Sequence, residues 1–261
     1  PHHLVLEAIL ISLQPQGPEQ DPAQLALARA IGVVLLPDLS RKLKVGDTDG
    51  GRDAFNRATE FAIALTLPAT VGLLVVPQAV VSVLFERGAF TSADSQNTAA
   101  AVAIYAVGLP AFVLQKVFQP LYFARENTKT PFYFALVSMV LNAAFAIGLS
   151  AQYGYLAAAI GTTLSSVALA ILLYWGVRRM GNATAFDARL LRAIPRMFGA
   201  AIIMGTVTYG LSIILETWIA TAGLRYIALA ILIIGGTATY FTACLAFGAF
   251  TKQDLLNFEK R

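Results

Sequence analysis

The sequence predicts an all-α, polytopic membrane protein with six full transmembrane helices and a partial one before them. Hydrophobic residues make up 57% of the 261 residues and charged residues only 13%, which is about half the charged share of an ordinary soluble domain. The mean hydropathy of +0.67 is too high for a soluble chain of this length. The charges lie in short clusters between long uncharged runs, and no run alternates as a transmembrane strand would.

The composition also excludes several classes of function. Cys244 is the only cysteine, and His2 and His3 are the only histidines, so neither a disulfide framework nor a cysteine or histidine metal centre is expected. The sequence carries no metalloprotease, esterase or phosphate-loop motif. No basic stripe is interleaved with aromatic residues, which argues against nucleic-acid binding. We therefore expect no catalytic residue, no metal and no cofactor.

The transmembrane helices follow from the lengths of the uncharged runs. A helix needs roughly 20 apolar residues to cross the hydrocarbon core, and the run Thr130–Val177 is long enough for two, with a turn at Ser150–Gly154. A shorter apolar stretch, Leu25–Leu36, carries Arg29 and predicts only a partial span. Residues 54–60 are expected to start a helix at the membrane surface. The six expected spans are 61–85, 97–123, 131–150, 154–177, 197–216 and 225–250.

Basic residues predict the orientation of these spans. Fifteen lysines and arginines lie in four alternate segments, which are 40–57, 124–129, 178–196 and the C-terminal tail. The three connections between those segments hold only Arg87 and Arg225. Because basic residues resist translocation, this bias places the connection 40–57 and the C-terminus in the cytoplasm. Binding of anionic lipid headgroups is the alternative reading of the same basic loops.

Four prolines fall within the expected spans: Pro68 and Pro77 in the first, Pro110 and Pro120 in the second. A proline inside a helix removes one backbone hydrogen bond and bends the helix. Bent and broken helices recur in transporters, but proline is also common in membrane helices generally. Functional kinks and ordinary membrane composition therefore both remain open.

Lys116 is the only charged residue that interrupts an otherwise apolar run, and Gln115 and Gln119 lie beside it. An ionisable residue inside the membrane is a functional candidate because it is costly to place there. With Gln115, Gln119 and Arg125, Lys116 makes up the candidate substrate pathway. The alternative is that Lys116 extends to the nearby membrane interface and has no role in transport.

Small residues recur every fourth position in the fourth expected span. Such spacing lets two membrane helices approach closely, so it predicts helix packing rather than a ligand site. Asn142 in the third span is expected to bond to a neighbouring helix. The residues of the two small rows are Ala157, Gly161 and Ser165, and Ala158, Thr162 and Ser166.

Three loop motifs resemble those of the lipid II flippase family, MurJ, also called MviN. They are Gly32–Lys42 (GVVLLPDLSRK), Leu84–Thr91 (LFERGAFT) and Lys116–Pro131 (KVFQPLYFARENTKTP). Each motif alone is a weak signal, but together they occur in the family's order at plausible spacing. The resemblance covers residues 25–261.

The resemblance implies a member of the multidrug/oligosaccharidyl-lipid/polysaccharide exporter superfamily, with fourteen spans and both termini in the cytoplasm. This chain looks like the C-terminal half of that transporter fold. The resemblance implies movement of a polyprenyl-pyrophosphate-linked saccharide across the bacterial cytoplasmic membrane by alternating access. Membrane lipid and the missing N-terminal half are the implied partners. By the same resemblance, Met197–Leu215 and Tyr226–Phe250 would form a groove for the lipid tail.

The chain also departs from the family pattern. The family's cavity is lined by arginines and acids mainly from spans that this chain lacks, and Gln16–Gln20 stands where the family has an Ala-Asp/Glu-Arg stretch. We therefore expect residues 1–24 to be a non-family segment, either read from a shifted frame or the artificial start of a truncated gene. Two alternative functions stay open: a transporter of another polyprenyl-linked saccharide or of a drug, and a non-transporting membrane remnant.

Overall fold

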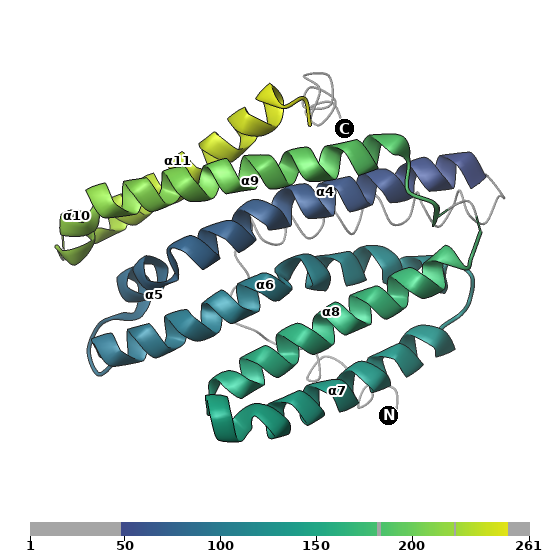
Figure 1. Ribbon diagram of the computed structural model, residues 1–261, viewed down its shortest axis with the longest axis horizontal. Coiled ribbons are helices and arrows are strands. Elements are labelled where there is room, and N and C mark those ends of the chain that lie inside the picture. Colours follow the sequence, from purple (N-terminus) through teal and green to yellow (C-terminus); the bar gives the residue numbers. More distant parts are fainter. Residues whose placement is uncertain (1–47, 182–183, 222, 250–261) are drawn as a thin grey trace, which may run out of the picture.

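The computed structural model describes residues 48–181, 184–221 and 223–249 (Figure 1). The segment 1–24, the partial span 25–36 and the C-terminal tail lie outside these residues. Over the described ranges the chain forms eight helices and no strand, which confirms the all-α prediction. The helices are α4 (Thr48–Val75), α5 (Pro77–Phe85), α6 (Ser92–Phe123), α7 (Lys129–Tyr153), α8 (Leu156–Arg178), α9 (Ala188–Ile214), α10 (Glu216–Ala220) and α11 (Arg225–Ala246).

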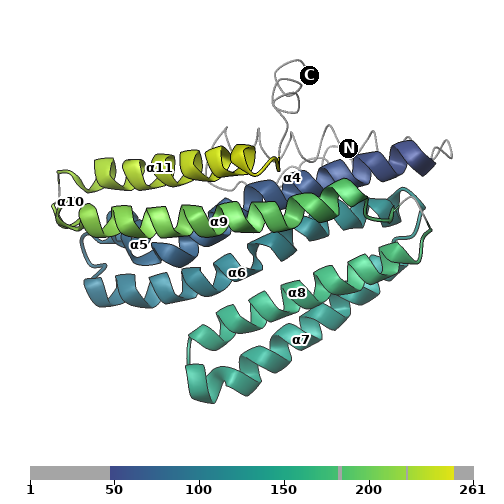
Figure 2. The same ribbon diagram turned by 45° about the horizontal axis from the view of Figure 1, so that its top comes forward.

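Six of these helices are long and apolar enough to cross a membrane, as the sequence predicts: α4, α6, α7, α8, α9 and α11. They lie side by side in the order α11, α9, α4, α6, α8, α7 (Figures 1 and 2). We call the end that holds the start of α4, the end of α8 and the start of α9 the basic end. The opposite end, with α5, α10 and the start of α11, is the far end.

The first span differs from the single helix expected over 61–85. Helix α4 begins at Thr48 and ends at Val75, and Pro77 then starts the separate helix α5. Proline has no N–H to continue the hydrogen-bond ladder, but its fixed φ suits the first turn of a helix. Pro77 therefore lies at a break between two helices rather than inside one.

Local caps explain the other large differences in helix ends. Helix α9 begins nine residues before the expected 197, because the side chain of Asp187 accepts a hydrogen bond from the Leu190 N–H. Helix α11 ends at Ala246 rather than at the expected 250. There Gly248 has φ +64°, and the Ala249 N–H bonds back to the Cys244 carbonyl, a common way to end a helix. The start of α9 and the end of α11 are therefore set by their caps, not by where charged residues lie.

The buried side chains gather toward the basic end. One cluster joins α4, α6 and α8 around Phe55 and Tyr122. A second joins α4, α9 and α11 around Met197 and Tyr240, and includes Cys244, which is fully buried as expected of a small packing residue. At the far end, the buried cluster among the described residues is smaller and consists of Leu215, Ala228 and Leu232. The helices are therefore held most firmly at one end.

Candidate functional site

The structure does not gather the four candidate pathway residues into one cluster. Gln115 is buried and points toward α8, where its Nε2 donates to the Ser166 carbonyl oxygen at 2.8 Å. Lys116, the next residue, is exposed on a different face of α6. Gln119 is half-buried, one turn further on. Gln115 therefore ties two helices together, whereas the side chain of Lys116 is exposed and that of Gln119 is partly exposed; their role in transport stays a prediction.

Apart from Gln119, the exposed face of α6 around Lys116 is apolar. Tyr105 and Phe123 flank it along the helix and are 40% and 52% exposed. Residues spaced by seven and eleven positions lie on the same face of a helix, so Phe123 and Tyr105 lie on the Lys116 face, about 10 and 16 Å away along the axis. A single cation on an aromatic face can hold an anionic group beside an apolar chain.

Arg125 lies just past the end of α6, in the loop to α7. Its Nη1 donates to the Met180 carbonyl oxygen at 2.8 Å, which links this loop to the end of α8. The side chain is exposed and sits at the basic end. Arg125 thus has a structural contact that the sequence did not indicate.

Three of the four prolines lie inside helices: Pro68 in α4, and Pro110 and Pro120 in α6. Each leaves one carbonyl without its usual intrahelical donor. Pro195 also lies inside a helix, in the part of α9 that the expected span left out. A role for these prolines in transport stays a prediction.

The sequence missed a buried polar cluster where α4 meets the start of α9 at the basic end. Glu60 is 3% exposed, and its carboxylate lies 2.5 Å from Nη1 of Arg57 and 3.5 Å from Nη2 of Arg189. Arg57 also pairs with Asp187 at 3.3 Å. A buried carboxylate is tolerated when cations and donors surround it. We call Arg57, Glu60, Asp187 and Arg189 the Glu60 cluster.

Asn56 extends this cluster toward the loop before α9. It is fully buried; its Nδ2 donates to the Ala185 carbonyl at 3.0 Å, and its Oδ1 accepts from the Asp187 N–H at 3.0 Å. Arg52 also donates to the Ala185 carbonyl, at 3.2 Å. The signal was present in the sequence, since Arg52, Asn56 and Glu60 follow at four-residue spacing on one helix face. The arginines were interpreted as orientation signals, with anionic-lipid binding as the alternative, and not as partners of a buried carboxylate.

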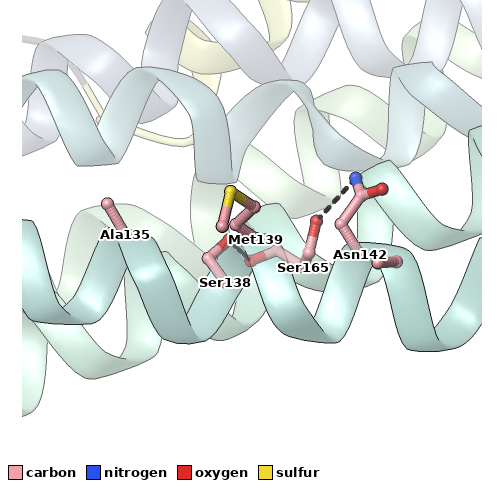
Figure 3. Close-up of a pocket in the computed structure, with 6 residues that line it drawn as sticks. Ala135, Ser138, Met139, Asn142 and Ser165 are labelled. Carbon is pink, nitrogen blue, oxygen red and sulfur yellow. Dashed lines mark hydrogen bonds between the residues drawn. The ribbon is translucent and has the colours of Figure 1, made fainter.

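A second polar contact lies between α7 and α8, beside an open pocket of about 400 Å³. Figure 3 shows Asn142 and Ser165 pointing toward one another; Nδ2 of Asn142 lies 3.3 Å from Oγ of Ser165 and 3.1 Å from Oγ1 of Thr162. Ser138 donates to the Ser165 carbonyl at 2.9 Å. These bonds confirm that Asn142 and the small residues of α8 serve helix packing.

Replacing Gly161 with alanine should destabilise the α7–α8 pair. A Cβ at this position would lie 3.0 Å from the Asn142 carbonyl oxygen and 3.1 Å from the Ala146 nitrogen, both of them backbone atoms. We expect a loss of about 1–3 kcal/mol, because neighbouring backbone cannot move aside cheaply. Thermal unfolding of the full chain in detergent measures it.

Gly148→Ala is the matched control, because nothing lies within 4 Å of a Cβ at Gly148. Alanine has the higher helix propensity by about 1 kcal/mol, so this variant should be neutral or slightly more stable. Equal melting temperatures for the two variants would show that α7 and α8 do not pack closely at Gly161.

The family model described as lipid II flippase MurJ matches residues 25–229. The chain belongs to this family. A probable lipid II flippase MurJ of Rhizobium meliloti (strain 1021) is 35% identical over 239 residues, covering 89% of this chain and 44% of the relative. One from Vibrio cholerae serotype O1 is 32% identical over 231 residues, covering 86% and 43%. The sequence-based assignment to the MurJ family is therefore confirmed.

A solved structure shares the fold. It is described as lipid II flippase MurJ in an inward closed conformation, and it matches with a TM-score of 0.65 at 23% identity. The match covers 87% of this chain and 43% of that one. The chain thus spans less than half the length of the MurJ proteins it resembles. These matches show that the chain is a multi-pass membrane protein of the MurJ family that spans part of the length of its relatives.

Proposed function

We propose that this chain is the C-terminal half of a flippase that moves a lipid-linked peptidoglycan precursor across the bacterial cytoplasmic membrane. The match to the MurJ family model over residues 25–229 carries the proposal, and the six membrane-length helices support it. The protein would act as a transporter, not an enzyme. Two halves would rock against each other around the substrate, exposing it to one side of the membrane at a time.

The proposed orientation places the basic end and the C-terminus in the cytoplasm, following the charge bias of the connections. We expect alkaline phosphatase, which is active only outside the cytoplasm, to be active when fused after Gly88 or Gly154 at the far end. Fusion after Gly181 should give an inactive enzyme but a fluorescent green fluorescent protein. Activity after Gly181 would reverse the orientation.

Lys116 is the proposed cation of this half for the pyrophosphate group. It is exposed on the same face of α6 as Tyr105 and Phe123, so a headgroup could bind Lys116 while the start of a lipid tail contacts the rings further along this face. A charge-assisted hydrogen bond contributes about 1.5–3 kcal/mol, so Lys116→Met should lower flipping about tenfold or more.

Lys129→Met is the control for Lys116→Met, because it removes the same charge from an exposed position at the start of α7. Both variants are compared at normal expression in a chimera that joins the upstream region of the Rhizobium meliloti relative to this chain. Unchanged growth with Lys116→Met would show that Lys116 only reaches the membrane interface.

Growth rescue tests the proposed function. The Rhizobium meliloti relative supplies the region upstream of the match, joined to this chain from Leu25. We expect this chimera to restore growth to a cell depleted of its own lipid II flippase. A chimera that inserts at wild-type levels but gives no growth would favour the non-transporting remnant. Growth rescue only for another lipid-linked saccharide pathway would favour the sibling transporter.

A further inference from the structure

Helices α9 and α11, joined by α10, form a hairpin that packs on the rest of the described bundle mainly through α4 and α5 (Figures 1 and 2). The contacts along this interface are unequal. They change from charged and tightly packed at the basic end to sparse at the far end.

At the basic end the hairpin is fastened by charge and by a large buried cluster. The Glu60 cluster joins α4 to the start of α9 through two arginines and two carboxylates. Eleven buried residues then fill the space between α4, α9 and α11, among them Ala64, Met197 and Tyr240. Separating the helices here would leave a buried carboxylate without its cations, which is costly.

Near the middle of the interface, buried hydroxyl groups lack hydrogen bonds. Among the described residues, the hydroxyl oxygens of Thr70 and Thr208 have no hydrogen-bond partner, and each residue is less than a tenth exposed. A buried hydroxyl without a partner costs about 1–3 kcal/mol. The packing of α4 against α9 therefore leaves these two hydroxyls unsatisfied near the middle of the interface.

At the far end the hairpin is held weakly. The buried cluster there consists of hairpin residues, and of the described hydrophobic residues packed against it Ala79 of α5 alone comes from outside the hairpin. Among the described residues, the hydrogen bond that links this end of the hairpin to the rest of the bundle runs from Nη1 of Arg225 to the Glu86 carbonyl oxygen at 3.4 Å, which is near the limit for a hydrogen bond.

We propose that the α9–α11 hairpin swings as one rigid unit. The Glu60 cluster at the basic end acts as the pivot, and the far end of the hairpin moves away from α5. Movement about a firmly packed end is a hinge motion, which several membrane and soluble proteins use to expose a site. The motion would open the interface between the hairpin and α5 at the far end only. It goes beyond the proposed function, because it does not depend on which substrate the protein carries.

Distances between pairs of spin labels in the full chain, reconstituted in lipid nanodiscs, test the swing. One pair, Asp53→Cys with Arg192→Cys, lies at the basic end on α4 and α9. The other, Gln78→Cys with Glu216→Cys, lies at the far end on α5 and α10. All four side chains are exposed. The native Cys244 is fully buried, so the unsubstituted chain gives the labelling background.

We expect one narrow distance distribution at the basic end and a broad or two-peaked distribution at the far end. Equally narrow distributions at both ends would overturn the proposal, because the hairpin would be rigid. A broad distribution at the basic end would overturn it as well, because there would be no pivot.

A variant then tests the Glu60 cluster as the pivot. Glu60→Gln should broaden the distribution at the basic end while circular dichroism shows unchanged helix content. Glu126→Gln, an exposed glutamate in the loop after α6, should leave it narrow. No broadening in Glu60→Gln would show that packing alone, without this cluster, fixes the basic end.

Discussion

Glu60→Ala should lower the unfolding free energy of the full chain by about 3 kcal/mol, the lower end of the range for breaking a buried ion pair. Alanine removes the carboxylate that lies against Arg57 and Arg189. The lower end applies because the two arginine side chains are 36% and 41% exposed and regain water when the carboxylate is lost. Unfolding by a denaturing detergent measures the loss.

Asp53→Ala is the matched control for Glu60→Ala. It removes a carboxylate from the same helix, but from an exposed position, and such surface changes usually stay within about 0.5 kcal/mol. Glu60→Gln should fall between the two, since an amide oxygen can still accept a bond from an arginine. Equal stability of Glu60→Ala and Asp53→Ala would contradict the assigned role of the Glu60 cluster.

Gly176→Ala should destabilise the contact between α6 and α8 by about 3 kcal/mol, as the sum of overpacking and a lost hydrogen bond. The Tyr122 hydroxyl donates to the Leu173 carbonyl at 2.7 Å and passes over Gly176. A Cβ at Gly176 would overlap this hydroxyl oxygen and lie 3.3 Å from Cζ of the same ring. Tyr122 is fully buried, so its ring has little room to move.

A double-mutant cycle separates the steric clash from other effects of the alanine. Tyr122→Phe alone should cost about 1 kcal/mol for its hydrogen bond. In that background Gly176→Ala should cost clearly less than in the native chain, because the oxygen it overlaps is gone. Additive costs would mean that Gly176 does not lie under the Tyr122 hydroxyl.

The number and type of the spans could be read from the sequence because crossing a membrane demands a long apolar run, and length alone records that demand. The helix ends could not. Charged residues such as Arg189 and Arg192 lie inside α9, because this helix begins directly after its N-cap, Asp187. The break at Val76 depends on Pro77, which starts a new helix. Pro68 lies inside α4 without ending it, so the same residue type has different effects at the two positions.

The candidate site was less accessible from the sequence. Gln115 and Lys116 are neighbours in the chain but face different directions, because adjacent helix residues point about 100° apart. The four-residue spacing of Arg52, Asn56 and Glu60 is visible in the sequence, but the partners of this face lie about 130 positions away, so no local pattern shows which residues complete the cluster. The Asn142 bonds were foreseen, since a polar residue in lipid must find a partner on the next helix.

Transport by the chimera in lipid vesicles tests the central claim most directly. The vesicles carry a fluorescent polyprenyl-pyrophosphate-linked saccharide, and the measurement is the fraction of it that crosses to the other leaflet. The account predicts crossing at a rate near that of the intact Rhizobium meliloti relative, and a rate about tenfold lower with Lys116→Met. A folded, inserted chimera that moves no more lipid than empty vesicles, while the relative does, would contradict it.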